Sequence, residues 1–251
     1  MATAITLVLD STTVGNGVPS DFTTYFISGI SGRGSIDIAL EKAAMSYSFF
    51  NISQNLGNNI LGYKTAAGNP TKQVVLPDGN YNVTDMNNYF QAQMKANGDY
   101  DQTNNTYYIT ISANVNALKT QVTISNNYVL DLTVSSIWQL LGYNGPLTIS
   151  ASGLSPNLIN ISNVNAILIH CSIVEGSYYN GNPSDILYMF VPNTSPGQYM
   201  TVQPNVPTYM RVLPDTIRDI TMYVTDNLGN LLDFNNQPIT YYLLLRERAS
   251  S

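Results

Sequence analysis

Charged side chains are scarce in this 251-residue chain: Asp, Glu, Lys and Arg make up 10% of it, against about 25% in ordinary soluble proteins. Residues 43–63 carry no charge, and Asp131 is the only formal charge between residues 120 and 174. Asn, Ser, Thr, Gln and Tyr replace the missing charge, while hydrophobic residues remain at 44%. The composition therefore indicates a folded chain whose neutral surface can pack against another protein without removing ions from water.

Histidine and cysteine occur once each, as His170 and Cys171. A single cysteine excludes an intramolecular disulfide. A single histidine excludes a histidine-rich metal site and any mechanism that needs two imidazoles. Adjacent strand residues point to opposite faces, so the two side chains cannot form a catalytic dyad. We expect a buried Cys171, a hydrogen-bonded His170 within a sheet, no metal site and no cofactor.

Basic clusters and long apolar runs are also missing. The net charge is −6, and no stretch forms the basic stripe that nucleic-acid binding requires. No run approaches the roughly 18 apolar residues of a transmembrane helix. Residues 1–15 lack the basic leader of a signal peptide. We therefore expect no direct contact with nucleic acid, no membrane span and no secretory leader.

Few carboxylate pairs could serve as catalytic groups, and only one glycine-rich segment could form a phosphate-binding loop. Asp37 with Glu41, and Glu175 with Asp185, are the pairs to consider for glycoside hydrolysis, which uses two facing carboxyl groups. Four residues along a strand span roughly 13 Å, too far for the first pair. Residues 29–34 contain three glycines but lack the Lys-Ser/Thr and the helix of a phosphate loop, so a surface loop is expected there. We predict no catalytic residues and no enzymatic activity.

The chain is rich in short strand patterns separated by Gly-, Pro- and Asn-bearing turns. Apolar and polar residues alternate, as in a sheet with one buried face, in residues 106–112, 120–125, 220–225 and 239–245. Residues 166–174 are apolar on both faces and predict a central strand covered on both sides. The absence of βαβ alternation and of a fixed-period repeat excludes parallel α/β folds, propellers and solenoids.

The C-terminal strands give the clearest core prediction. Residues 216–247 are interpreted as a hairpin, or as two neighbouring strands, with a turn at residues 226–230. The side chains expected to lie buried against a facing sheet are Ile220, Met222, Val224, Ile239, Tyr241 and Leu243.

Two segments interrupt the strands with helical spacing. The first is predicted over residues 83–97, with Asn82 or Thr84 as its N-cap. The second is predicted over residues 135–141, with Trp138 anchoring it on a sheet. The whole pattern favours an all-β, antiparallel jelly-roll β-sandwich with two short inserted helices. We expect one domain over residues 1–251, or alternatively two compact jelly rolls over about 1–145 and 146–251.

Several of these segments resemble jelly-roll capsid proteins of Polinton-type viruses, polinton-like viruses and virophages. The resemblance lies in the runs ILIHCSIVEGSYYNGNPSDILYMFVP and VQPNVPTYMRVLPDTIRDITMYVTDNLGNLLDFNNQPITYYLLLRE, which include Pro207 and Tyr209. The earlier segments MSYSFFNIS, LPDGNYNVTDMNNYF and LLGY resemble the same proteins. Together they cover about two-thirds of the chain, and none of these motifs is catalytic.

The resemblance implies a structural virion protein made in a host cell. The length of the chain is similar to that of the penton or minor capsid subunit at the vertices of an icosahedral shell. The partners that the resemblance implies are further copies of the chain, in a homopentamer, and other capsid proteins. A major capsid protein with a compact double jelly roll is the alternative within this class. Outside it, the alternative is a lectin-like or receptor-binding sandwich that would use exposed aromatics such as Tyr178 and Tyr179. A host-receptor contact is compatible with either.

Overall fold

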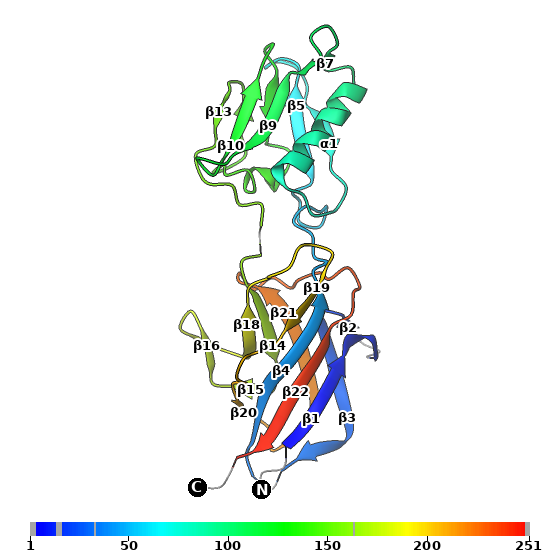
Figure 1. Ribbon diagram of the computed structural model, residues 1–251, viewed down its shortest axis with the longest axis vertical. Coiled ribbons are helices and arrows are strands. Elements are labelled where there is room, and N and C mark those ends of the chain that lie inside the picture. The colour runs from blue at the N-terminus through cyan, green and yellow to red at the C-terminus, as the bar shows by residue number, and fades with distance from the viewer. Residues whose placement is uncertain (1–3, 14–16, 33, 163, 249–251) are drawn as a thin grey trace. The chain divides into compact units, whose positions relative to one another are not determined.

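The computed structural model describes residues 4–13, 17–32, 34–162 and 164–248. The chain forms two compact units (Figure 1): unit 1 comprises residues 1–49 and 164–251, and unit 2 comprises residues 50–163. Unit 2 is therefore an insertion in the sequence of unit 1. This division differs from the expected single domain over 1–251, and the alternative boundary near residue 145 falls inside unit 2. The alternation along a strand shows which of its faces is buried but not which strands share a core, so the sequence did not reveal this division.

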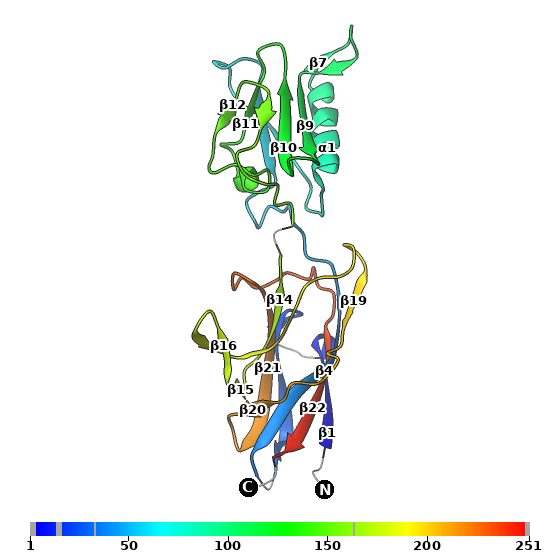
Figure 2. The same cartoon turned by 60° about the vertical axis from the view of Figure 1, so that its left-hand side comes forward.

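Unit 1 is an antiparallel jelly-roll β-sandwich (Figures 1 and 2). Its first sheet has the order β1–β22–β4–β20–β15, and β19 also pairs with β4. These strands are β1 (Ala4–Asp10), β22 (Thr240–Glu247), β4 (Ile36–Ser46), β20 (Met210–Val212), β15 (Val174–Glu175) and β19 (Tyr199–Val202). The second sheet has the order β18–β14–β21–β3–β2. Its strands are β18 (Ile186–Phe190), β14 (Ile167–Cys171), β21 (Thr216–Asp226), β3 (Asp21–Ser31) and β2 (Gly17–Val18).

The chain alternates between the two sheets as it proceeds, which corrects one prediction. β1, β4 and β22 belong to the first sheet, and β3, β14 and β21 belong to the second. Strands β21 and β22 are therefore neither a hairpin nor neighbours: β21 pairs with β14 and β3, and β22 pairs with β1 and β4. The sequence does turn at residues 226–230, where the Asp226 carboxylate accepts hydrogen bonds from the backbone N–H groups of Leu228 and Asn230.

The predicted core of unit 1 is confirmed. All six predicted residues, namely Ile220, Met222, Val224, Ile239, Tyr241 and Leu243, are fully buried. They belong to one apolar cluster that also contains the inward-facing side chains of β4 and β14. Strand β14 lies between β18 and β21 and is buried along its whole length, as its two apolar faces predicted. The two strands misassigned as neighbours thus contribute to the core from opposite sheets.

Unit 2 is built from smaller sheets and one helix. One sheet has the order β12–β11–β5–β6 and another the order β13–β10–β9. Their strands are β5 (Ile60–Lys64), β6 (Lys72–Val75), β9 (Ile109–Asn114), β10 (Lys119–Ile124), β11 (Val129–Asp131), β12 (Thr148–Ile149) and β13 (Gly153–Leu154). A small hairpin, β7 (Tyr100–Asp101) with β8 (Thr106–Tyr107), completes the sheets. Helix α1 (Val83–Ala96) packs on β9.

Helix α1 agrees with its predicted span and cap. The Asn82 side chain accepts a hydrogen bond from the N–H of Asp85 at 2.9 Å, which satisfies a free donor of the first turn. On the buried face, Asn87 accepts a hydrogen bond from the Ile111 N–H, and Gln91 donates to the Ile109 carbonyl. These two amides fix the helix to the strand it covers.

The second predicted helix is shorter than expected. Residues 135–141 contain only one 3₁₀ turn, η2 (Ser136–Trp138), capped by the Ser135 hydroxyl. Ile137 is fully buried, whereas Trp138 is half-buried, so isoleucine is the deeper anchor of this segment. Gly142 follows with φ +79°, and a Cβ there would lie 2.6 Å from the Asn157 carbonyl oxygen. The close backbone contact and the positive φ together require glycine.

Candidate functional site

A cleft in the outer surface of unit 1 is the candidate functional site. It has a volume of about 750 Å³ and lies among β15, β20 and the hairpin of β16 (Ser177–Tyr179) and β17 (Asn182–Ser184). The cleft is lined by Ser172, Val174, Glu175, Gly176, Ser177, Tyr178, Pro183, Ser184, Asp185, Arg211 and Leu213.

The hairpin β16–β17 determines where the aromatic side chains point. Its turn consists of Asn180 and Gly181, both with positive φ, as the tight turns of two-stranded hairpins require. Successive strand residues face opposite sides. Accordingly, the Tyr179 hydroxyl donates a 2.9 Å hydrogen bond to the Asn227 carbonyl, while Tyr178 lines the cleft and is 70% exposed. One tyrosine fixes the hairpin, and the other leaves its ring available to a ligand.

Asp185 contributes a fixed carboxylate to the cleft. Its Oδ1 lies 2.8 Å from His170 Nδ1, and the Tyr223 hydroxyl donates to its Oδ2 at 2.8 Å. His170 and Tyr223 are direct partners across β14 and β21, and their rings stack at 4.2 Å. Burial, together with the hydrogen bond to Asp185, raises the pKa of Tyr223 above its usual value. Tyr223 therefore remains a hydrogen-bond donor, and 30% of the Asp185 side chain stays exposed.

The Thr225 hydroxyl, the His170 imidazole and the Asp185 carboxylate form a row of hydrogen-bonded groups, but the hydroxyl in this row is buried. His170 Nε2 lies 3.0 Å from the Thr225 hydroxyl, on the opposite side of the ring from Asp185. Nucleophilic catalysis would need that hydroxyl to reach a substrate. Thr225 is only 6% exposed and does not line the cleft. The arrangement thus orients Asp185 and leaves no accessible nucleophile in this row.

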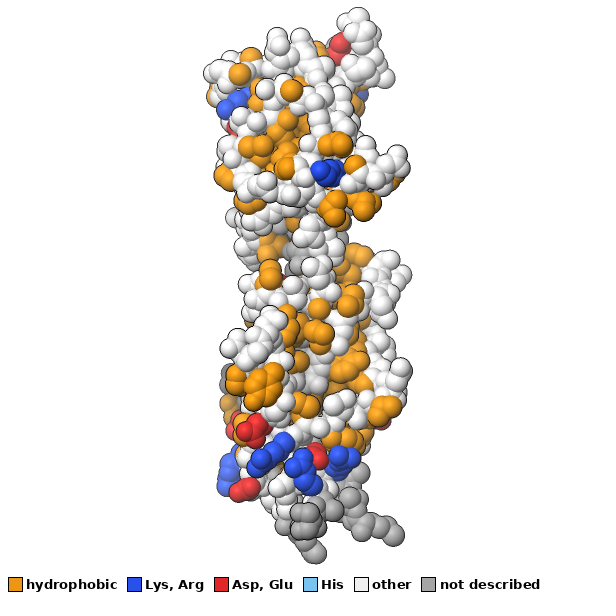
Figure 3. All heavy atoms as spheres, turned by 90° about the vertical axis from the view of Figure 1, so that its left-hand side faces the viewer, with side chains coloured by type: hydrophobic (Ala, Val, Ile, Leu, Met, Phe, Trp, Pro, Cys, Tyr) orange, Lys and Arg blue, Asp and Glu red, His pale blue; other side chains and the backbone are white. Residues whose placement is uncertain are grey.

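A row of alternating charges crosses the first sheet and ends at the cleft. Arg246 on β22 and Arg211 on β20 both pair in register with Asp37 on β4, and Glu175 on β15 pairs with Arg211. Opposite charges on neighbouring strands stabilise such a register modestly. The Glu175–Arg211 ion pair is loose, at 3.8 Å, with both side chains at least half exposed. Figure 3 shows charged side chains gathered at one end of unit 1 on the face drawn.

The sequence-derived candidates are therefore only partly brought together. Glu175 and Asp185 line the same cleft, whereas Asp37 is 3% exposed and forms ion pairs with Arg246 and Arg248. Sequence reasoning missed Arg211 and Tyr223, because neither is close in sequence to the residues it serves. Strand pairing brings Arg211 beside Glu175 and Tyr223 beside His170.

Cys171 and the glycine-rich segment take no part in the site. Cys171 is fully buried in the sandwich core, and burial raises the pKa of its thiol to about 12. Such a thiol is a weak nucleophile at neutral pH. The glycine-rich segment is not wholly a loop, since β3 continues through Ser31, and Arg33 lies outside the described residues.

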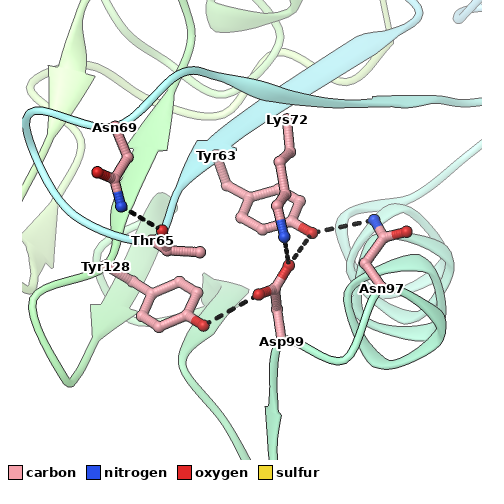
Figure 4. Close-up of polar contacts among 7 residues, drawn as sticks. All are labelled: Tyr63, Thr65, Asn69, Lys72, Asn97, Asp99 and Tyr128. Atoms are coloured by element: carbon pink, nitrogen blue, oxygen red, sulfur yellow. Dashed lines mark hydrogen bonds and ion pairs between the residues drawn. The ribbon is translucent and has the colours of Figure 1, made fainter.

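Unit 2 contains a second polar cluster, centred on Asp99 (Figure 4). The Tyr63 hydroxyl and Lys72 Nζ each donate to Asp99 Oδ2 at 2.6 Å, and the Tyr128 hydroxyl donates to Oδ1 at 3.2 Å. Burial alone would raise the pKa of Asp99, but the bonds from Lys72 and Tyr63 outweigh it and hold that pKa below its usual value. Because Asp99 is 7% exposed and has three donors, we interpret the cluster as an anchor for the end of α1.

Across the described ranges, no group of three or more His, Cys, Asp or Glu side chains could hold a metal ion. Among the helices that the structure describes, none has the length and apolar character needed to cross a membrane.

The fold that unit 1 defines is found in a viral capsid protein. The mavirus penton protein aligns over 97% of this chain and 99% of its own, with a TM-score of 0.50 and 11% sequence identity. Domains D2–D3 of the flagellar cap protein FliD from Escherichia coli align at 11% identity over 94% of this chain and 98% of theirs, with a TM-score of only 0.15. No known family model and no curated protein matches the sequence. At 11% identity, the penton alignment establishes a shared fold.

Proposed function

We propose that this chain is a structural virion protein: a penton, or minor capsid subunit, that assembles at the vertices of an icosahedral shell. The observation that carries the proposal is the alignment with the mavirus penton protein, which extends over almost the full length of both chains. A likeness confined to a β-sandwich would be common among unrelated proteins. This one also includes the segment inserted between β4 and β14, which a sandwich does not need.

The surface of unit 1 supports association between copies. Tyr25 and Ile27 on β3 are 69% and 104% exposed, and Val8 on β1 is 56% exposed. Apolar and neutral side chains of this kind can pack against a neighbour without burying ions. A ring brings two different patches of each subunit together, and closure then sets the subunit number. The number five follows from the likeness to the penton protein.

The alternative of a major capsid protein with two jelly rolls is less well supported. The described residues of unit 2, 50–162, form a three-stranded sheet, a four-stranded sheet, the β7–β8 hairpin and a helix, with a separate core. A second jelly roll would need two facing sheets of about four strands each.

The oligomeric state tests the proposal. We expect the purified chain, alone or co-expressed with its shell partners, to form a closed ring of five 27.5 kDa subunits, detected by analytical ultracentrifugation and electron microscopy. Neutral interfaces contain few charge pairs for salt to screen, so the ring should persist from about 0.1 to 1 M NaCl. A chain that stays monomeric at high concentration, both alone and with its partners, would refute the capsid role.

A further inference from the structure

We propose that the cleft beside the β16–β17 hairpin is a binding site for a neutral carbohydrate, with Tyr178 as the surface on which a sugar ring stacks. The cleft, at about 750 Å³, is within the range of about 300–1,000 Å³ found for small-molecule sites. A pyranose ring has a face of C–H groups and a rim of hydroxyls. It therefore needs a flat apolar surface beside polar groups that both donate and accept hydrogen bonds.

Tyr178 supplies the flat surface. Tyr178 is 70% exposed although the hairpin that carries it is held in place, since Tyr179 is bonded to Asn227 and the Ser177 hydroxyl to the Ser184 carbonyl. An aromatic ring buries a large apolar area when a ligand covers it, and a tyrosine on a backbone held in place has only its two side-chain torsions to order. The hairpin thus presents an aromatic surface that the protein itself leaves uncovered.

The polar groups around the ring suit hydroxyls. Glu175 and Asp185 are acceptors, Arg211 is a donor, and the Ser172 and Ser184 hydroxyls of the cleft can act as either. A sugar hydroxyl also donates and accepts, so it can bridge a carboxylate and a guanidinium. Asp185 is already oriented by His170 and Tyr223 while 30% of its side chain remains exposed. A carboxylate held in this way binds without first being ordered.

The charge balance separates a neutral sugar from other ligands. The lining contains two carboxylates and one guanidinium, a net charge of −1, which disfavours phosphate, sulfate and sialic acid. A lysine or arginine of a partner protein would be attracted to the carboxylates, but it would have to approach Arg211, which lies 3.8 Å from Glu175. A neutral, hydroxyl-rich ligand can form hydrogen bonds with the carboxylates and with the guanidinium of the cleft at the same time.

The test compares two equally exposed tyrosines in the full-length chain. The wild type, Tyr178→Ala and Tyr199→Ala are each passed over an immobilised panel of neutral oligosaccharides of hexose and N-acetylhexosamine, together with sialylated and sulfated glycans and a lysine-rich peptide. Tyr199 is 69% exposed on β19 and does not line the cleft, so it controls for the loss of a surface aromatic. We expect wild type and Tyr199→Ala to bind the same neutral glycans, and Tyr178→Ala to bind them at least tenfold more weakly.

Three results would overturn the inference: no binding of any neutral glycan by the wild type, binding confined to the anionic glycans or the peptide, or equal binding by Tyr178→Ala. The oligomeric state of each variant, measured in the same preparations, keeps this inference separate from the capsid role. A ring that forms normally but binds no sugar removes only the carbohydrate site. A sugar-binding chain that never assembles removes only the capsid role.

Discussion

Each unit has an apolar core, but the two differ in how their buried carboxylates are held. Unit 1 combines strands from both ends of the sequence into two facing sheets around an apolar core, and its carboxylate Asp37, 3% exposed, forms ion pairs with Arg246 and Arg248. Unit 2 is continuous in sequence, and beside its own apolar core it buries Asp99 and Asp131, which are 7% and 1% exposed and whose several hydrogen-bond donors lower the pKa of each. Apolar burial is insensitive to pH, whereas a buried carboxylate stabilises a fold only while it is ionised. The two units should therefore fail under different perturbations.

The most damaging change should be a charge in the apolar core of unit 1. Leu243 is fully buried on β22, so Leu243→Asp would place a carboxylate among apolar side chains at a cost of more than about 4 kcal/mol. We expect loss of soluble expression, measured by fractionation. Val206→Asp, at a position 77% exposed, should stay soluble. A soluble, assembled Leu243→Asp protein would contradict the core assignment.

Individual strands show how much of this fold the sequence determines. Alternation in residues 220–225 and 239–245 identified the buried faces of β21 and β22 correctly, because side-chain direction has a period of two along any strand. It could not show that these strands lie in opposite sheets, since partner choice depends on how a connection crosses the sandwich. For the same reason, the alternation could not show that unit 2 is inserted in unit 1, because the strands of both units have the same local pattern.

The candidate site was predictable in part for a related reason. Glu175, Tyr178 and Asp185 lie within eleven residues of one another, and the sequence marked all three. Arg211 and Tyr223 join them only through the pairings of β20 with β15 and of β21 with β14. A lone histidine in a strand predicts some hydrogen-bond partner but does not identify Asp185 or Thr225.

Acid should destabilise unit 2 before unit 1. Burial raises the pKa of Asp131, but hydrogen bonds from Thr133 and Thr71 outweigh it and leave that pKa lowered, as for Asp99. A carboxyl group whose pKa is lower in the folded state stabilises the fold above its unfolded pKa, about 3.9. That stabilisation is lost as the pH falls through the folded value. We expect unit 2 to lose stability below about pH 4.

The only tryptophan makes this measurable. Trp138 lies in unit 2, so its fluorescence follows that unit, while far-UV circular dichroism follows both. The fluorescence transition in an acid titration should precede most of the loss of strand signal. Asp99→Asn should already be less stable at neutral pH and should show a smaller pH dependence, whereas Asp85→Asn, in the exposed first turn of α1, should behave like the wild type. Coincident transitions in the wild type would show that the two units do not differ in this way.

The finest test of the contrast removes one hydroxyl from each core. Tyr63 in unit 2 donates to Asp99 at 2.6 Å and accepts from Asn97 at 3.0 Å, so Tyr63→Phe should cost about 1.5 to 3 kcal/mol, the usual value for a hydrogen bond to a charged group.

The Tyr241 hydroxyl in unit 1 is fully buried and has no hydrogen-bond partner among the described residues. Removing a buried, unpaired hydroxyl relieves a desolvation cost. Tyr241→Phe should thus be neutral or more stable by about 1 kcal/mol, and urea unfolding of the two variants should shift in opposite directions. A destabilised Tyr241→Phe would mean that the apolar core of unit 1 relies on a polar contact after all, and the two units would then differ less than their cores suggest.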